Sequence, residues 1–137
     1  MLETLEILFD FGLLVLIWMV QLIVYPSFLF YNEKDLVRWH QVYTGRIAMV
    51  VIPLMFGQLG ISAYQVYDIT GTISIVKFAL IALVWVSTFA YFAPTHGKIS
   101  QGNTDKVVLT QLVNRNWWRT LAWTLVSIVS FYQMISK

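Results

Sequence analysis

The chain lacks cysteine, has few charged residues, and carries none of the short motifs that mark common soluble enzymes. With no cysteine among 137 residues, disulfides, thiolate metal sites and cysteine nucleophiles are excluded. Charged residues make up 12% of the chain, about half of the roughly 25% that is typical of soluble domains. The sequence has no HExxH, EF-hand, Walker A or GxGxxG motif, so it gives no support for a zinc protease, calcium sensor, nucleoside triphosphatase or dinucleotide enzyme.

Positive charge is also scarce where a secretion signal or a nucleic-acid surface would need it. The opening stretch MLETLEILFD has Glu3, Glu6 and Asp10 but no lysine or arginine, so it lacks the basic segment of a cleaved signal peptide. We therefore expect the first apolar run to remain as a helix. The formal net charge is only +2 and the basic residues are confined to particular loops, which argues against a nucleic-acid partner.

What the chain has instead is apolar sequence. Hydrophobic residues make up 58% of it and the mean hydropathy is +0.69. Four apolar runs of roughly 20 residues can each cross a hydrocarbon core of roughly 30 Å. The sequence thus predicts an all-α integral membrane protein, an up-down-up-down four-helix bundle forming a single domain over residues 1–137. The predicted helices span residues 5–30, 39–64, 73–92 and 117–135.

The connection before the last helix is the longest. Pro94 and Gly97 are predicted to end the third helix. Thr104 and Asp105 are good capping residues, so the fourth helix could begin near residue 104 and extend beyond the bilayer on the cytoplasmic side.

Basic residues are distributed unevenly between the two ends of this bundle. Only Lys77 and Lys137 lie at one end, whereas seven lie in or just after the first and third connections. Positively charged connections remain in the cytoplasm. We therefore predict a multi-pass bacterial inner-membrane protein whose two basic connections are cytoplasmic and whose termini are both periplasmic. The seven basic residues are Lys34, Arg38, Arg46, Lys98, Lys106, Arg115 and Arg119.

Polar side chains gather where all four helices approach the cytoplasmic leaflet. Helical spacing places several of them on shared faces, including a stripe of Asn116, Arg119 and Trp123 at the start of the last helix. The opposite leaflet offers only Lys77 and Gln58, and no carboxylate is predicted deep in a helix, which argues against a carboxylate metal site or proton relay. The predicted site consists of Tyr25, His40, Tyr43, Arg46, His96, Asn116, Arg119 and Trp123.

These residue types indicate a small-molecule site and an enzyme of oxygenase or oxidoreductase type. Arg46, predicted about two helical turns (roughly 10 Å) inside the membrane, and Arg119 would hold an anionic group or stabilise an enolate or phenolate. His40 or His96 would transfer protons near neutral pH. We assign catalytic roles to His40, Arg46 and Arg119, and expect the other five residues to bind an apolar or aromatic, partly anionic ligand.

Other readings remain open from the sequence alone. The arginines could extend to lipid headgroups, and the polar cluster could hold together a non-catalytic accessory subunit that docks a membrane partner or a second copy of itself. His40 and His96 could also serve as the two axial ligands of a haem b, although the sequence requires no cofactor.

Four segments, VYPSF, WHQVYTGRI, PTHGKISQG and LVNRNWWRTLAWT, carry a resemblance that covers nearly the whole chain. The chain resembles a group of small four-helix bacterial membrane proteins, most specifically in the Asn-Trp-x-Arg-Thr run formed here from Asn116 to Thr120. That likeness implies a fold and no particular activity. More distantly, in size, helix count and last helix, the chain resembles the anthrone oxygenase-like family, which implies cofactor-free oxygenation of an aromatic polyketide.

Overall fold

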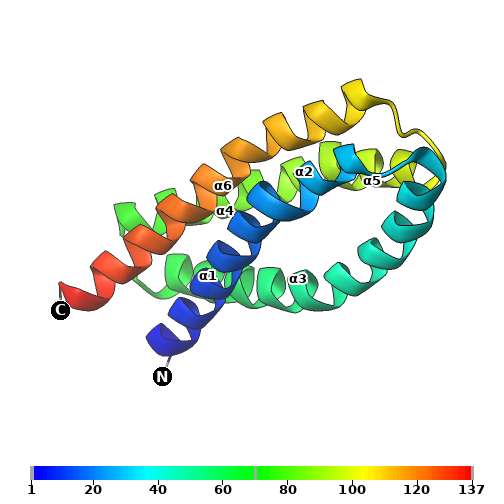
Figure 1. The fold of residues 1–137 in the computed structure, drawn as a ribbon. Helices are drawn as coiled ribbons and strands as arrows, with labels where there is room; N and C mark the ends of the chain where they lie inside the picture. Colours follow the sequence, from blue (N-terminus) through cyan, green and yellow to red (C-terminus); the bar gives the residue numbers. More distant parts are fainter. Residues whose placement is uncertain (1, 70, 137) are drawn as a thin grey trace.

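The computed structural model describes residues 2–69 and 71–136, and in it four long helices follow one another, each antiparallel to the one before. The predicted all-α four-helix bundle is confirmed. Figure 1 shows both chain ends at one end of the bundle, which we call the terminal end, and the first and third connections at the other, which we call the basic end. The elements are α1 (Leu2–Met19), η1 (Val20–Val24), α2 (Tyr25–Ser27) and η2 (Phe28–Phe30) in the first helix, α3 (Glu33–Ile69) as the second, α4 (Thr72–Ser87), η3 (Thr88–Phe92) and α5 (Ala93–Ser100) in the third, and α6 (Lys106–Ile135) as the fourth.

The fourth helix begins close to the early start that its capping residues suggest. The Asp105 side chain accepts a hydrogen bond from the backbone N–H of Val107 at 2.9 Å, which satisfies one of the free amides at the start of α6. As a result α6 is 30 residues long and includes the whole Asn116–Trp123 stripe in one continuous helix.

The prediction that Pro94 and Gly97 end the third helix is wrong. The five residues of η3 form a wider π-helical turn, in which the N–H of Ala93 bonds to the carbonyl of Thr88. A proline lacks an amide hydrogen and its ring crowds the preceding turn, and a local π-turn can absorb that conflict without breaking the helix. The helix therefore continues through Pro94 to Ser100.

The first helix uses the same device. In η1 the N–H of Tyr25 bonds to the carbonyl of Val20, and Pro26 follows at once. In each case a single residue, Tyr25 or Ala93, separates the end of the π-turn from the proline. Single π-turns are frequent at functional sites, and these two directly precede Tyr25 and the segment that carries His96.

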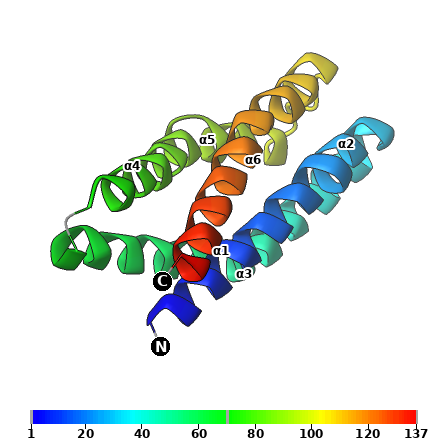
Figure 2. The same ribbon diagram turned by 90° about the vertical axis from the view of Figure 1, so that its left-hand side faces the viewer.

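Side-chain packing forms two apolar clusters along the bundle axis. α6 packs mainly against α1 and α4, and α1 also packs against α3, an arrangement that Figure 2 shows from the side. One cluster, around Phe28, Tyr43 and Leu112, lies toward the basic end, and the other, around Leu13 and Trp123, lies in the middle.

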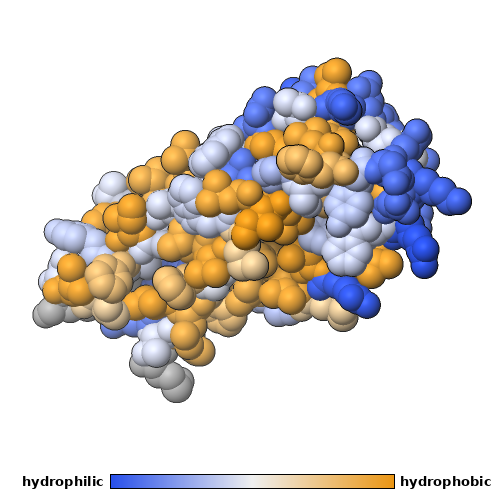
Figure 3. Space-filling model, in the orientation of Figure 1, coloured by the Kyte–Doolittle hydropathy of each residue, from blue (hydrophilic) through white to orange (hydrophobic). Residues whose placement is uncertain are grey.

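Three helical segments are long and apolar enough to cross a membrane: Leu2–Phe30, Glu33–Asp68 and Thr72–Ser100. The described part of α6 is not one of these segments. Its inward face carries four buried polar residues, Asn116, Arg119, Thr120 and Ser130. Its outward face is apolar, with Leu121, Leu125, Ile128 and Phe131 exposed. Figure 3 shows apolar residues over most of the visible surface and hydrophilic residues gathered at the basic end.

Candidate functional site

A cavity of about 520 Å³ lies among the helices, in the half of the bundle nearer the basic end. All four helices contribute to its wall, which is mostly aliphatic and aromatic. The polar groups that reach it include Tyr25, Tyr43, His96, Ser100 and Arg119. Among its lining residues Ile52, Phe56 and Phe89 are exposed on the molecular surface, so the cavity opens between α3 and the third helix.

One wall of the cavity carries a chain of hydrogen bonds between side chains from three helices. The Tyr25 hydroxyl lies 2.8 Å from Nε2 of His96, and Nδ1 of His96 lies 2.8 Å from Nε2 of His40. Nδ1 of His40 in turn lies 2.8 Å from the Ser100 hydroxyl. His40 is fully buried, so it contacts the cavity only through its partners. We call Tyr25, His96, His40 and Ser100 the relay chain.

A proton can pass along the relay chain, because each imidazole accepts at one ring nitrogen when it donates at the other. In one arrangement Tyr25 donates to His96, His96 to His40, and His40 to Ser100. In the reverse arrangement every bond points the other way and the tyrosine proton faces the cavity. A proton that enters at one end and a proton that leaves at the other convert the first arrangement into the second.

Arg119 provides a buried positive charge beside the relay chain. Its side chain is 6% exposed, and Nη1 donates to Oδ1 of Asn116 at 3.3 Å. The guanidinium lies over two aromatic rings, with Cζ 4.1 Å from the ring centre of Phe92 and 5.1 Å from that of Trp123. Nε has no hydrogen-bond partner, and no carboxylate of the described residues forms an ion pair with this arginine.

A second layer of hydrogen bonds fixes Asn116. Its side-chain Nδ2 donates to Oε1 of Gln21 at 2.9 Å, and Nε2 of Gln21 donates to the backbone carbonyl of Val113 at 3.2 Å. Asn116 and Gln21 are both buried, which holds the acceptor oxygen toward Arg119. The guanidinium is therefore positioned by packing and by a fixed amide rather than by an opposite charge.

The structure brings together all but one of the residues predicted for this site. Arg46 is exposed on α3 and does not line the cavity. The structure therefore does not bring Arg46 to the site: six residues of helix rotate position 46 to roughly 120° from His40, and its side chain is exposed. The sequence reading missed Ser100 as a partner of His40. The residues that lie together are Tyr25, His40, Tyr43, His96, Asn116, Arg119 and Trp123.

The two histidines do not fit a haem held between them. Axial imidazoles bind the iron from opposite faces of the macrocycle. Here the nitrogens that point toward each other are joined directly at 2.8 Å, and the ring centres are 5.0 Å apart.

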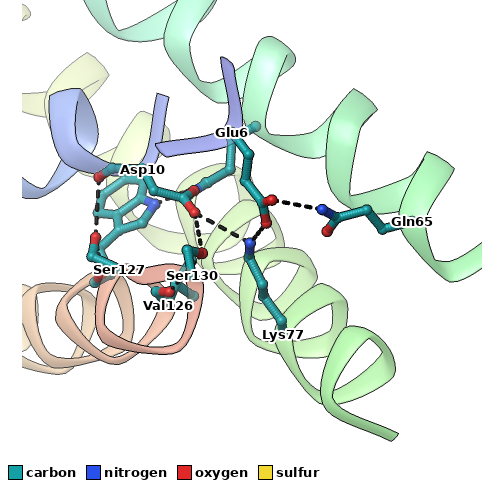
Figure 4. Close-up of polar contacts among 9 residues, drawn as sticks. Glu6, Asp10, Gln65, Lys77, Val126, Ser127 and Ser130 are labelled. Carbon is teal, nitrogen blue, oxygen red and sulfur yellow. Dashed lines mark hydrogen bonds and ion pairs between the residues drawn. The ribbon is translucent and has the colours of Figure 1, made fainter. Parts of the chain in front are cut away.

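A second polar cluster lies toward the terminal end, where the sequence reading expected little (Figure 4). The Lys77 ammonium group forms ion pairs with Glu6 and with Asp10, whose Oδ2 is 3.2 Å away. Nε2 of Gln65 donates to Oε2 of Glu6 at 2.6 Å, and the Ser130 hydroxyl donates to Oδ2 of Asp10. The expectation that no carboxylate lies deep in a helix is therefore wrong for Glu6 and Asp10, both of which are buried within α1.

The side chains of Trp123 and Gln58 join the site at Arg119 to the cluster of Glu6, Asp10 and Lys77. Nε1 of Trp123, whose ring contacts Arg119, donates to Oε1 of Gln58 at 3.0 Å. Nε2 of Gln58 donates to Oδ1 of Asp10 at 2.7 Å. The sequence carried a signal for the second cluster: Glu6 and Asp10 are one helical turn apart, and Lys77 is the only charged residue in the apolar run 73–92.

No family model, curated protein or solved structure matches this chain. The two resemblances that its motifs suggest therefore stay predictions. Within residues 2–69 and 71–136, no group of three or more histidine, aspartate or glutamate side chains is arranged to hold a metal ion.

Proposed function

We propose that this protein is a membrane enzyme that takes an apolar or aromatic molecule with an anionic or acidic head group from the bilayer and transfers protons to or from that head group. Reaction classes that begin with such a step include the oxygenation of phenolic or enolic aromatics, and the likeness to the anthrone oxygenase-like family supports that choice. The central observation is Arg119, a buried cation at the wall of an apolar cavity that forms no ion pair with any carboxylate of the described residues.

The charge of Arg119 explains the preference for an anionic head group. A buried charge is costly unless an opposite charge or several hydrogen bonds compensate it. The guanidinium donates to Asn116, interacts with the Tyr25 hydroxyl and lies on the aromatic faces of Phe92 and Trp123. None of these groups carries a full negative charge, and Nε has no hydrogen-bond partner among the described residues. A carboxylate, phenolate or enolate in the cavity would complete its hydrogen bonding.

The rest of the cavity suits the apolar body of such a ligand. A volume of about 520 Å³ falls within the range of roughly 300–1,000 Å³ that is usual for small-molecule sites. Its opening is bordered by the exposed apolar side chains Ile52, Phe56 and Phe89 on membrane-spanning segments. The ligand would therefore enter sideways from the lipid phase.

The relay chain supplies the acid or base. When Tyr25 donates to His96, its oxygen can still accept a proton from a substrate hydroxyl in the cavity. As it does so, it passes its own proton to Nε2 of His96, and the protons on His96 and His40 each move one group further toward Ser100. Ser100 then releases its proton at the basic end of the bundle, and Arg119 stabilises the substrate anion that remains.

We further infer that the basic end faces the cytoplasm of a bacterial inner membrane and that α6 is the fourth membrane-spanning helix. The first inference rests on the concentration of lysine and arginine at that end. The second rests on the packing of α6 against α1 and α4 and on the apolar outward face of α6. Protons that leave the relay chain would then enter the cytoplasm.

The proposal is tested with a long-chain fatty acid that carries bromine on its chain, and with its uncharged methyl ester. Both probes quench nearby tryptophans, and Trp85 and Trp123 line the cavity. In lipid nanodiscs the acid should quench saturably at a far lower concentration than the ester. Equal affinities for the two probes would mean that the cavity does not select an anionic head group.

A further inference from the structure

We propose that the cluster of Glu6, Asp10 and Lys77 is a proton-binding site that holds one exchangeable proton and opens toward the terminal end. This site is separate from the cavity at Arg119. The inference rests on the charges in the cluster, on a buried hydroxyl without a partner, and on a path from the cluster to the surface, and it does not depend on the proposed enzyme activity.

The charges in the cluster do not balance when every group is ionised. Glu6 and Asp10 would contribute two negative charges and Lys77 one positive charge, which leaves a net charge of −1. These three side chains are 7%, 2% and 1% exposed, so water screens that charge poorly. One added proton makes the cluster neutral, and neutralisation is the usual response of a buried charge that has no partner.

The other neighbours of the cluster within residues 2–69 and 71–136 do not supply the missing positive charge. α3 contributes the amides of Gln58 and Gln65, and α6 contributes the hydroxyl of Ser130, all uncharged. The only other titratable side chains at the adjoining pocket are Glu3 and Tyr132, both exposed, and neither adds positive charge. Within the described residues, Lys77 is thus the single cation of the cluster.

The hydroxyl group of Ser62 on α3 is a further sign that the cluster takes up a proton. Ser62 is 2% exposed, and its Oγ forms no hydrogen bond with any described residue. It follows Gln58 by four residues and precedes Gln65 by three, so the three side chains share one face of α3. Gln58 and Gln65 both donate to the carboxylates, and Ser62 therefore faces the same space, where a protonated carboxyl group or the water that delivers its proton could pair with it.

The cluster also has a route to the surface. A pocket of about 340 Å³ is bordered by Glu6, Gln65 and Ser130 on its inner side. Its outer border includes Leu2 and Ile73, both exposed near the terminal end. Protons can therefore reach Glu6 from the side of the bilayer opposite to Ser100.

The experiment is infrared spectroscopy of the protein in nanodiscs at neutral pH, where the carbonyl stretch of a protonated carboxyl group is separate from the bands of carboxylates. The wild-type chain should show the band of one carboxylic acid per molecule. Glu6→Gln and Asp10→Asn should each abolish it, because the single remaining carboxylate balances Lys77. Lys77→Met should double its area, because two carboxyl groups must then be protonated.

Asp68→Asn is the matched control, because Asp68 is an exposed carboxylate on the same side of the bundle and should leave the band unchanged. Isotope labelling of the aspartate and glutamate carboxyl groups in the wild-type chain reports on the band even where a variant folds poorly. A wild-type spectrum without a carboxylic acid band overturns the proposal. A band that survives both Glu6→Gln and Asp10→Asn also overturns it.

Discussion

Replacement of Arg119 by glutamine should remove anion binding while it leaves the fold nearly as stable as before. Among the described residues that line the cavity, Arg119 carries the only positive charge, and the change deletes it but keeps a polar side chain that can bond to Asn116. Loss of one member of a buried, hydrogen-bonded charge pair costs about 2–5 kcal/mol of binding free energy. At about 1.4 kcal/mol per factor of ten, the affinity for the brominated acid should fall by roughly 30-fold to several thousand-fold.

The stability of the same variant should change little, because opposing contributions nearly cancel. The guanidinium loses two cation–π contacts, each worth about 0.5–2 kcal/mol. Against this, the variant no longer buries a charge that lacks a carboxylate partner among the described residues, and burial of such a charge costs several kcal/mol. We expect the free energy of unfolding to stay within about 2 kcal/mol of wild type.

Arg115→Gln is the matched control in the same helix. Arg115 is exposed and stacks on Tyr91, with Cζ 4.4 Å from the ring centre, and it does not line the cavity. Quenching titrations in nanodiscs should give this variant the affinity of wild type. A folded Arg119→Gln variant that binds the brominated acid as tightly as Arg115→Gln would show that Arg119 does not hold the anionic head group.

Three further predictions follow from individual contacts. Tyr25→Phe should leave the affinity for the brominated acid unchanged but lower turnover of the natural substrate by about 10²–10⁴-fold, because the cavity end of the relay chain is lost; equal turnover would exclude Tyr25 as the acid or base. Lys77→Met should lower the free energy of unfolding by about 3–5 kcal/mol at neutral pH, where folding forces Glu6 and Asp10 to take up protons, and by less in acid, where the unfolded chain is protonated as well, as measured by denaturant titration. Gly57→Ala should lower the free energy of unfolding by about 1–3 kcal/mol, because an added Cβ would lie 2.5 Å from the Phe9 ring. Gly60→Ala, with no neighbour within 4 Å of the added Cβ, should change it by less than about 0.5 kcal/mol. Similar values for the two variants would mean that the Phe9 ring moves aside at little cost.

The fold was accessible from the sequence because the apolar runs are long and clearly separated. Their composition predicts membrane helices regardless of the packing between them. The continuous helix through Pro94 was not accessible, because the π-turn that accommodates the proline depends on local backbone geometry. Residue types alone favour a break at that position.

The site at Arg119 was largely predictable because its polar residues all lie at the same end of their helices. Arg46 was assigned to the site from its predicted depth in the membrane, but the direction in which its side chain points from the helix axis leaves it exposed. The cluster at Glu6 and Asp10 was missed for the opposite reason. A charge near the start of a chain resembles a solvated end, and only the packing of α3, α4 and α6 around α1 shows that both carboxylates are enclosed.

In the proposed function, Arg119 holds the anionic head group of a lipophilic molecule in the cavity. The most direct test is to extract the protein from the membrane into polymer-bounded lipid discs without detergent, and to identify the small molecules released from wild type, Arg115→Gln and Arg119→Gln by mass spectrometry. We predict that a lipophilic acid or phenol accompanies the first two proteins in an amount close to one per chain and is missing from the third. Recovery of only phospholipids, in equal amounts from all three proteins, would contradict the claim.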